Sequence, residues 1–391
     1  MDGQRLEKAN SEDGTERVQK SCSGRHCLYC KEDEVPGGCS VTRDSSAACN
    51  MLMLLKLKLS GKPRPHNFLE GVVQISVGSC FVPIMGLKHL PRKLLVGKTW
   101  QIRRSNSRLH MARPDGVPED MWAYCQALPK AELHTHLHGS VPESIIEELA
   151  SEQSLDVTSA REALREARSR GASLSECFAV FDALHELVND LSAVRRITAG
   201  SLAAFAADNV CYVELRTTPR ALRDGSSAEA YLEAVLEAMR GAEGATTPCG
   251  LPLLSRLVVS VDRARGSAAA EAAVRLALAC RRRHGDWVAG LDLSGDPTKG
   301  SWEEVLPALD LARRGRLRVT VHAAEVENPE ESAAMLRWRP DRMGHVCCMS
   351  QEQFDAMLRL GIPLELCLTS NVVTASVDSV QAHHFATLHP D

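Results

Sequence analysis

The chain has 391 residues, of which 44% are hydrophobic and 25% are charged, and its formal net charge is −4. This composition is that of an ordinary globular protein and excludes collagen-like and wholly disordered chains. The near-neutral charge gives no reason to expect a nucleic-acid partner. At about 150 residues per domain, the length allows one large domain with additional segments, or several small domains.

Neither a membrane span nor a disulfide framework is indicated. The most apolar run, Met51–Leu59, contains two lysines and is much shorter than the roughly 18 residues of a membrane-spanning helix. No basic leader and apolar run open the chain, so we predict no signal peptide. Fourteen cysteines are scattered through the sequence, whereas disulfide frameworks are typical of small secreted domains. We therefore interpret most of them as reduced thiols and expect a cytoplasmic protein in the cytosol, with no membrane partner.

Residues 1–115 differ in character from the rest of the chain. The segment 86–114 contains eight lysines and arginines and no acidic residue, which is typical of a solvated segment. A proline- and glycine-rich linker signal follows at 114–118. We expect 1–115 to be a disordered extension. The alternative is a small zinc module, although the spacing of its ligands matches no established zinc template; they would be Cys22, His26, Cys27, Cys30 and Cys39.

From residue 119 onward, short apolar runs alternate with longer segments of helical period. Several of the runs are apolar almost throughout, as expected of parallel strands that are covered on both faces. The predicted strands are Glu132–Leu137, Val210–Arg216, Leu257–Asp262, Val288–Leu293, Leu317–His322, Arg342–Cys347 and Pro363–Leu368.

The helical segments between these runs complete a repeated β-then-α order. We predict helices at Glu143–Ser151, with Ser140 as the N-cap, and at Ala228–Met239, Ala268–Arg282 and Glu303–Arg313. Such a repeat over 119–391 favours an α/β fold with a (β/α)8 TIM barrel over an open doubly wound sheet. No glycine-rich phosphate fingerprint follows the first strand, which argues against a dinucleotide-binding domain.

Two histidines in the first predicted strand form a candidate metal half-site. His134 and His136 are two residues apart, so they project to the same side of a strand. At the carboxyl end of a barrel strand, that side faces the catalytic mouth. The alternative interpretation of an isolated His-x-His pair is a surface histidine cluster.

Further histidines at other strand ends favour the metal site. His322 ends the fifth predicted strand and His345 lies in the sixth. Three protein histidines on zinc leave a position for a water whose pKa falls toward neutrality. Glu325 lies three residues after His322 and would transfer a proton at the mouth, and His345 would orient the attacking group or stabilise developing charge.

Seven sequence motifs resemble the adenosine deaminase family, a branch of the metal-dependent amidohydrolases. They are PKAELHTHLHGS, SECFAVFDALHEL, YVELRTTPR, VSVDR, GLDLSGDP, RMGH and PLELCLTSN, and the resemblance covers about 123–390. It is strongest to the adenosine deaminase-like branch, which acts on N6-substituted adenosine monophosphate. The resemblance implies a zinc (β/α)8 barrel that hydrolytically replaces a purine 6-amino or 6-alkylamino group by oxygen.

The resemblance also assigns roles to individual residues. It implies one zinc ion per chain, held by His134, His136 and His322, with Glu325 and His345 as the catalytic pair. A small-molecule purine nucleotide or nucleoside is the implied partner, and we expect a monomer. The implied substrate-binding residues are His136, His185, Thr217, Thr218, Pro219, Arg220, Asp262, Gly295 and Asp296.

Two of these assignments have alternatives. Arg220 carries a guanidinium that suits a phosphate, but it could equally be a surface arginine. Asp262 could be a cap at a strand end.

One departure from the family affects the expected activity. The segment 381–390 matches the helix that precedes the family's eighth strand, and the sequence ends at Asp391 before a match to the Thr-Asp-Asp motif that supplies a metal carboxylate. We therefore expect a barrel that lacks its eighth strand, with two unpaired edges, and weak or absent activity of this chain alone. The alternatives are a non-catalytic protein that retains the purine pocket, and a deaminase that converts adenosine to inosine.

Overall fold

The computed structural model describes residues 118–155, 181, 184–379 and 382–384, together with the backbone of two short strands at 74–77 and 80–83. Residues 66–379 form one compact unit, which contains every element named below, and 382–384 belong to a second unit. The candidate zinc module and the basic segment 86–114 lie outside the described residues.

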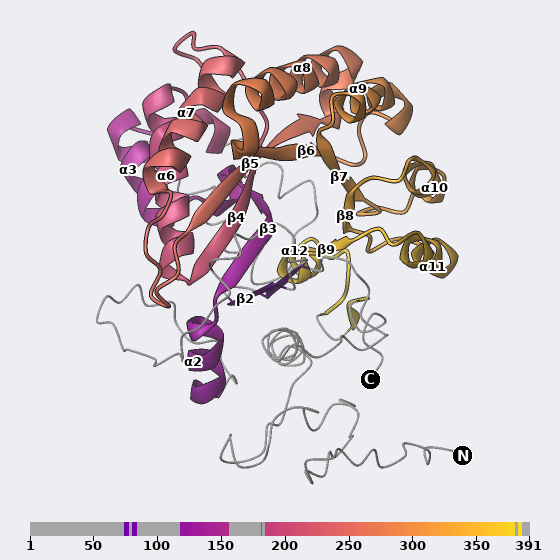
Figure 1. The fold of residues 1–391 in the computed structure, drawn as a ribbon, viewed down its shortest axis with the longest axis horizontal. Coiled ribbons are helices and arrows are strands. Elements are labelled where there is room, and N and C mark those ends of the chain that lie inside the picture. Colours follow the sequence, from indigo (N-terminus) through magenta and orange to yellow (C-terminus); the bar gives the residue numbers. More distant parts are fainter. Residues whose placement is uncertain are drawn as a thin grey trace. The chain divides into compact units, whose positions relative to one another are not determined.

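Seven parallel strands form the centre of the unit, and each pairs with the next along the chain. Every one of them overlaps a strand predicted from the sequence. Because they are parallel, their carboxyl ends all open on one edge of the sheet (Figure 1). They are β3 (Lys130–His136), β4 (Val210–Thr217), β5 (Leu254–Asp262), β6 (Val288–Ser294), β7 (Arg318–Ala323), β8 (Arg342–His345) and β9 (Leu364–Leu366).

Helices follow the strands and cover the outside of the sheet (Figure 1). Their buried faces are apolar, as in α7, where Leu232, Val235 and Leu236 are at most 1% exposed. The four predicted helices are confirmed within a few residues. The α-helices are α2 (Glu119–Ala127), α3 (Glu143–Gln153), α6 (Leu191–Ala207), α7 (Ala228–Ala242), α8 (Gly266–His284), α9 (Trp302–Arg314), α10 (Pro329–Trp338), α11 (Gln351–Leu360) and α12 (Leu368–Val373).

The predicted N-cap of α3 is wrong. Pro142 occupies the cap position and makes no side-chain hydrogen bond. The hydroxyl of Ser140 instead donates to the backbone oxygen of His136, at 2.8 Å, and lies 2.6 Å from the hydroxyl of Thr135. Its bonds therefore hold the turn that follows β3 rather than the start of the helix.

A hairpin that the sequence analysis did not predict extends the sheet. Strand β1 (Gln74–Val77) pairs in parallel with β9, with Gln74 opposite Glu365 and Ile75 opposite Leu366. Strand β2 (Cys80–Pro83) pairs antiparallel with β1 and approaches β3 at the other end of the sheet. The position beside β9 is thus taken by β1, and the sheet curves back toward its first parallel strand. The expectation of an unpaired edge at the last predicted strand is therefore wrong, because a strand from outside the predicted barrel supplies its backbone partners.

The structure confirms the predicted α/β class as a TIM-like, nearly closed barrel of parallel strands. Side chains with almost no exposed surface fill the space between strands and helices, among them Leu215, Val259, Leu291 and Ile197. Among the described residues, no helix combines the length and the apolar character needed to cross a bilayer.

Candidate active site

Three predicted metal ligands meet at the carboxyl edge of the barrel. His134 and His136 come from β3, and His322 comes from β7. Their ring centroids lie 4.6 to 5.6 Å apart, and one ring nitrogen of each falls within 4.8 Å of the others. The structure therefore brings together residues that are 186 positions apart in the sequence.

For two of the three rings, those of His134 and His322, a buried carboxylate fixes which nitrogen faces the site. The Nδ1 atom of His134 lies 2.6 Å from Oε2 of Glu365, and Nδ1 of His322 lies 3.0 Å from Oδ1 of Asp292. An imidazole that donates from Nδ1 keeps the lone pair of Nε2 free for a ligand. In both rings the second nitrogen is thus prepared to bind a cation.

A charged network below the histidines holds these carboxylates in place. The guanidinium of Arg216 donates to Asp292, at 3.1 Å, and also to Glu365. A second guanidinium, that of Arg342, lies with its Nε atom 3.0 Å from Glu365. Arg216, Asp292 and Glu365 are all fully buried. Each buried charge is compensated by an opposite one, which is the condition under which ions are tolerated inside a protein.

The ionisation of the three histidines matches a metal site. Burial, assisted by neighbouring cationic groups, lowers the pKa of His134 well below its usual value and that of His136 to about 3, so both rings are neutral. Burial also acts to lower the pKa of His322, but Asp292 outweighs it and raises the pKa. A cation that binds all three therefore displaces a proton from His322 when that ring is charged.

The donor set fits a divalent ion. The two Nε2 atoms of His136 and His322 are 3.1 Å apart. Tetrahedral zinc, with Zn–N bonds of about 2.0–2.1 Å, places neighbouring nitrogens about 3.4 Å apart. A small outward movement of the rings produces that separation, and three neutral imidazoles are a common ligand set for zinc.

Glu325 lies two residues after the end of β7, and His345 is the last residue of β8. Their side chains approach to 3.6 Å, between Oε2 of Glu325 and Nε2 of His345. The Nδ2 atom of Asn371, which can only donate, is 2.9 Å from Nδ1 of His345, so Nε2 carries the ring proton. Burial lowers the pKa of His345 and raises that of Glu325. The pair therefore offers a neutral imidazole beside a carboxyl group that holds its proton more strongly than usual.

The backbone around this pair is strained. His345 has φ = 64°, Val346 has φ = 53° and Ala324 has φ = 48°, a region that costs residues other than glycine about 1–2 kcal/mol each. The loops are tied together by a bond from the amide of Val346 to Ala323 O, at 2.9 Å. Strained residues persist where surrounding contacts determine them, and they cluster at functional sites.

The predicted nucleotide-binding residues gather around the end of β4. Thr217 is buried, and its hydroxyl lies 2.6 Å from that of Tyr231. Thr218 and Pro219 follow it in the turn after the strand. The guanidinium of Arg220 donates to the backbone oxygen of His185, at 3.0 Å, and to that of Val188, at 2.6 Å. Arg220 is thus half-buried, with part of its guanidinium already bound to the protein.

The imidazole of His185 belongs to a second pair of histidines. Its ring packs edge-on against that of His138, with the centroids 4.5 Å apart. His138 begins the short 3-10 helix η3 (His138–Ser140), which is separated from the end of β3 by one residue. His185 therefore lies against the turn that follows the two metal-ligand candidates of that strand.

The remaining predicted site residues lie at the carboxyl ends of β5 and β6. Asp262 accepts a hydrogen bond from the amide of Ala264, at 3.0 Å, so it does act as a cap at its strand end. Gly295 has φ = 97°, and a Cβ atom there would lie 2.3 Å from Oδ1 of Asp262, so only glycine fits this close approach. Asp296 accepts from the amide of Thr298, at 3.0 Å, and keeps its turn in shape.

Comparisons with known proteins agree with this geometry. The family profile described as "Adenosine deaminase" matches residues 129–391. The chain belongs to the adenosine deaminase family. It is 39% identical to the N6-mAMP deaminase of Arabidopsis thaliana over 287 residues, which cover 68% of this chain and 79% of that protein.

Two further relatives of this adenosine deaminase family member extend the comparison. It is 34% identical to the N6-Methyl-AMP deaminase of Homo sapiens over 267 residues, 66% of this chain and 74% of that protein. The crystal structure of Arabidopsis ADAL in complex with IMP superposes with a TM-score of 0.61 at 38% identity, covering 68% of this chain and 78% of that one.

Sequence reasoning missed the residues that support the site. Asp292 and Glu365 each interrupt an apolar run in their strands, and Arg216 lies two residues after Glu214 in β4. A charge inside a buried strand is a signal of a partner or a site. Asn371 lies in the PLELCLTSN motif, but nothing local indicates that it bonds to His345. In this adenosine deaminase family member, the supporting network could thus have been suspected from its charges but not paired.

Proposed function

We propose that the protein is a zinc-dependent hydrolytic deaminase of purine nucleotides. The preferred reaction is N6-methyl-AMP plus water to IMP plus methylamine. The family membership and the relatives named N6-methyl-AMP deaminases support the reaction class. The observation that carries the proposal is the convergence of His134, His136 and His322 with Glu325 and His345 at one edge of the barrel.

Zinc would be held by the Nε2 atoms of His134 and His322 and by His136. When bound, the ion would supply Lewis-acid activation of water near neutral pH. Asp292 and Glu365 hold the ligating rings in the orientation that this requires.

Glu325 and His345 would move and position protons at the purine. The raised pKa of Glu325 keeps its carboxyl group protonated closer to neutral pH, which suits donation to a purine ring nitrogen. The lowered pKa of His345 keeps the ring neutral, and its Nε2–H, 3.6 Å from Glu325, would orient the attacking oxygen. Loss of either group removes a proton path and leaves the metal ligands intact.

Substrate orientation would come from the loops around the same edge. Gly295 and Asp296, after β6, would contact the purine edge, and Asp262 would lie beside them. His185 would contact the nucleotide, together with the last residue of β4, Thr217, and the three residues that follow it, Thr218, Pro219 and Arg220. Arg220 retains further N–H groups beyond those bound to backbone oxygens, so it would still bind a phosphate.

The test uses the purified 391-residue chain. Metal content is measured, and the protein is then incubated with N6-methyl-AMP, AMP and adenosine while purine products are separated by chromatography. Formation of IMP from N6-methyl-AMP supports the proposal. A preference for adenosine favours the adenosine-to-inosine alternative, and bound metal without turnover of any substrate favours the non-catalytic alternative. The matched control is Glu325→Gln, which should retain the metal and lose turnover.

A further inference from the structure

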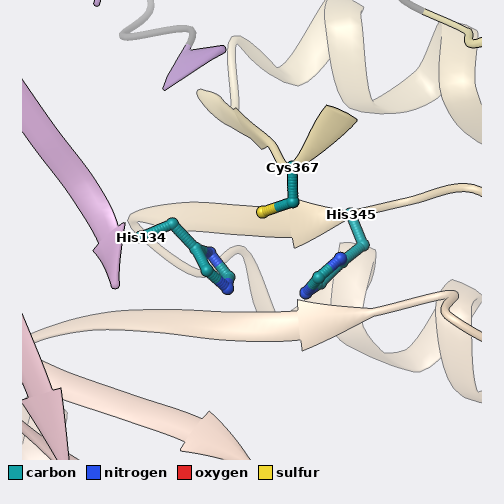
Figure 2. A group of neighbouring side chains, drawn as sticks. All are labelled: His134, His345 and Cys367. Carbon is teal, nitrogen blue, oxygen red and sulfur yellow. The ribbon is translucent and has the colours of Figure 1, made fainter. Parts of the chain in front are cut away.

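A cysteine lies beside two of the histidines and has no place in the proposed reaction. Cys367 follows β9 directly, and its side chain is 3% exposed. Figure 2 shows its sulfur directed between the rings of His134 and His345. One ligand atom of each of these three residues lies within 4.8 Å of the others.

This set is distinct from the three-histidine set. The two sets share His134 only, and among the described residues they do not merge into one larger group. The Cys367 thiol makes a long hydrogen bond, 3.9 Å, to the backbone oxygen of Glu365. Such a weak bond is readily given up to a stronger partner. Its sulfur is therefore available beside two imidazoles.

We propose that His134, His345 and Cys367 form a second metal site, which takes a thiophilic divalent cation such as cadmium or zinc. One thiolate and two imidazoles are soft to borderline ligands, which such cations prefer over carboxylate oxygen. Binding breaks the S–H bond of Cys367, releases that proton to solvent and forms a metal–sulfur bond. His345 binds through Nε2 after its ring proton moves to Nδ1, where the Asn371 side chain accepts it once its amide oxygen is turned toward the ring. The thiolate offsets one of the two positive charges of the cation.

The local structure prepares this site. Glu365 holds Nδ1 of His134, which leaves the other nitrogen as a basic ligand. The same carboxylate lies close below the set and favours a cation there. The positive charge of Arg216, which is bound to that carboxylate, repels a cation. The site therefore suits a metal that forms strong bonds to sulfur better than a metal that is held by charge alone.

The two sets compete for His134. Because Nδ1 of that ring is bound to Glu365, one nitrogen remains, and it can bind one cation at a time. A cation in the second site also engages His345, which the proposed function uses. It follows, if the proposed function holds, that thiophilic metals inhibit the enzyme. The binding itself does not depend on the proposed function.

The test measures metal–sulfur bonding directly in the metal-free full-length chain. Cobalt(II) is added, and the thiolate-to-cobalt charge-transfer absorption in the near ultraviolet is recorded. The readout is the difference between the wild type and Cys367→Ser, because cysteines near the N-terminus such as Cys27 and Cys30 also offer sulfur. We expect this absorption to fall in Cys367→Ser and to remain unchanged in Cys280→Ser, which alters a buried cysteine of α8.

A second variant keeps the test independent of the three-histidine set. His136→Ala removes a ligand of that set only, so the Cys367-dependent absorption should persist in it and disappear in the double variant His136→Ala, Cys367→Ser. Equal absorption in the wild type and Cys367→Ser overturns the proposal, as does its loss in His136→Ala. Circular dichroism of the metal-free variants checks that each is folded, and none of these outcomes requires catalytic turnover.

Discussion

The carboxylate of Glu365 is the most connected charge of the site, and its removal gives the sharpest test of the buried network. It is fully buried and contacts His134, Arg216, Arg342 and Thr320. The substitution Glu365→Gln keeps the shape of the side chain and removes its charge. We expect it to lower both the stability of the fold and the affinity for a metal ion.

The magnitude follows from what the substitution leaves behind. Breaking a buried ion pair by removing one partner costs about 3–5 kcal/mol. Arg216 keeps its bond to Asp292, and Arg342 keeps its bond to Glu214, so we expect a loss at the lower end, about 3 kcal/mol. The affinity for a metal should fall by about 10- to 100-fold, as for other residues that orient a ligating histidine.

The loss should also depend on pH. Burial alone would raise the pKa of Glu365, but Arg216 and Arg342 outweigh it and hold the pKa below its usual value. A group with a depressed pKa in the folded state stabilises the protein above its unfolded pKa, which is about 4.3 for glutamate. The difference between wild type and Glu365→Gln should therefore be complete at pH 7 and shrink as the pH falls below about 4.

Urea unfolding at several pH values, with a chelator present, measures the effect on stability. The control is Glu271→Gln, which removes a half-exposed carboxylate from an ion pair with Arg275 on α8 and should change the free energy of unfolding by less than about 0.5 kcal/mol. A Glu365→Gln protein within about 0.5 kcal/mol of the wild type at pH 7, with unchanged metal affinity, would refute the reasoning.

Three further predictions concern single side chains. His322→Ala should abolish retention of zinc by the purified chain, measured by elemental analysis, and zinc retained at the wild-type level would contradict its assignment as a ligand. Ile197→Ala removes a side chain with no exposed surface from α6 and should reduce the free energy of unfolding by about 2–5 kcal/mol in urea; a loss below 1 kcal/mol would mean that the core is poorly packed there. Ser350→Ala deletes a capping box with Gln353 at the start of α11 and should lower the free energy of unfolding by about 1 kcal/mol. Ser376→Ala, which changes a serine away from any helix start, is the comparison.

Local patterns in the sequence were enough to predict the parallel barrel and the clustering of the candidate histidines at one edge of it. Strand alternation placed His134 and His136 on one side of β3, and the β-then-α order placed His322 and His345 at the same edge. Side chains repeat every two residues along a strand and every 3.6 residues along a helix, and parallel strands end at the same edge of a sheet. Both patterns can be read from short stretches of chain. Conversely, the hairpin of β1 and β2 was not predicted, because short strands carry too little periodic signal to be separated from a loop.

The tertiary structure alone decided which charges and ligands meet. The carboxylate on His134 comes from a residue 231 positions away, and Arg216 joins partners 76 and 149 positions away. Similarly, the wrong N-cap at Ser140 reflects a choice between two bonds that both suit a serine hydroxyl. A residue type and its spacing determine which side of a strand it faces, but its partner depends on how distant strands are aligned in the sheet. That alignment is set by packing of the whole barrel, so the network around Glu365 and the place of Cys367 beside two histidines follow only from the fold.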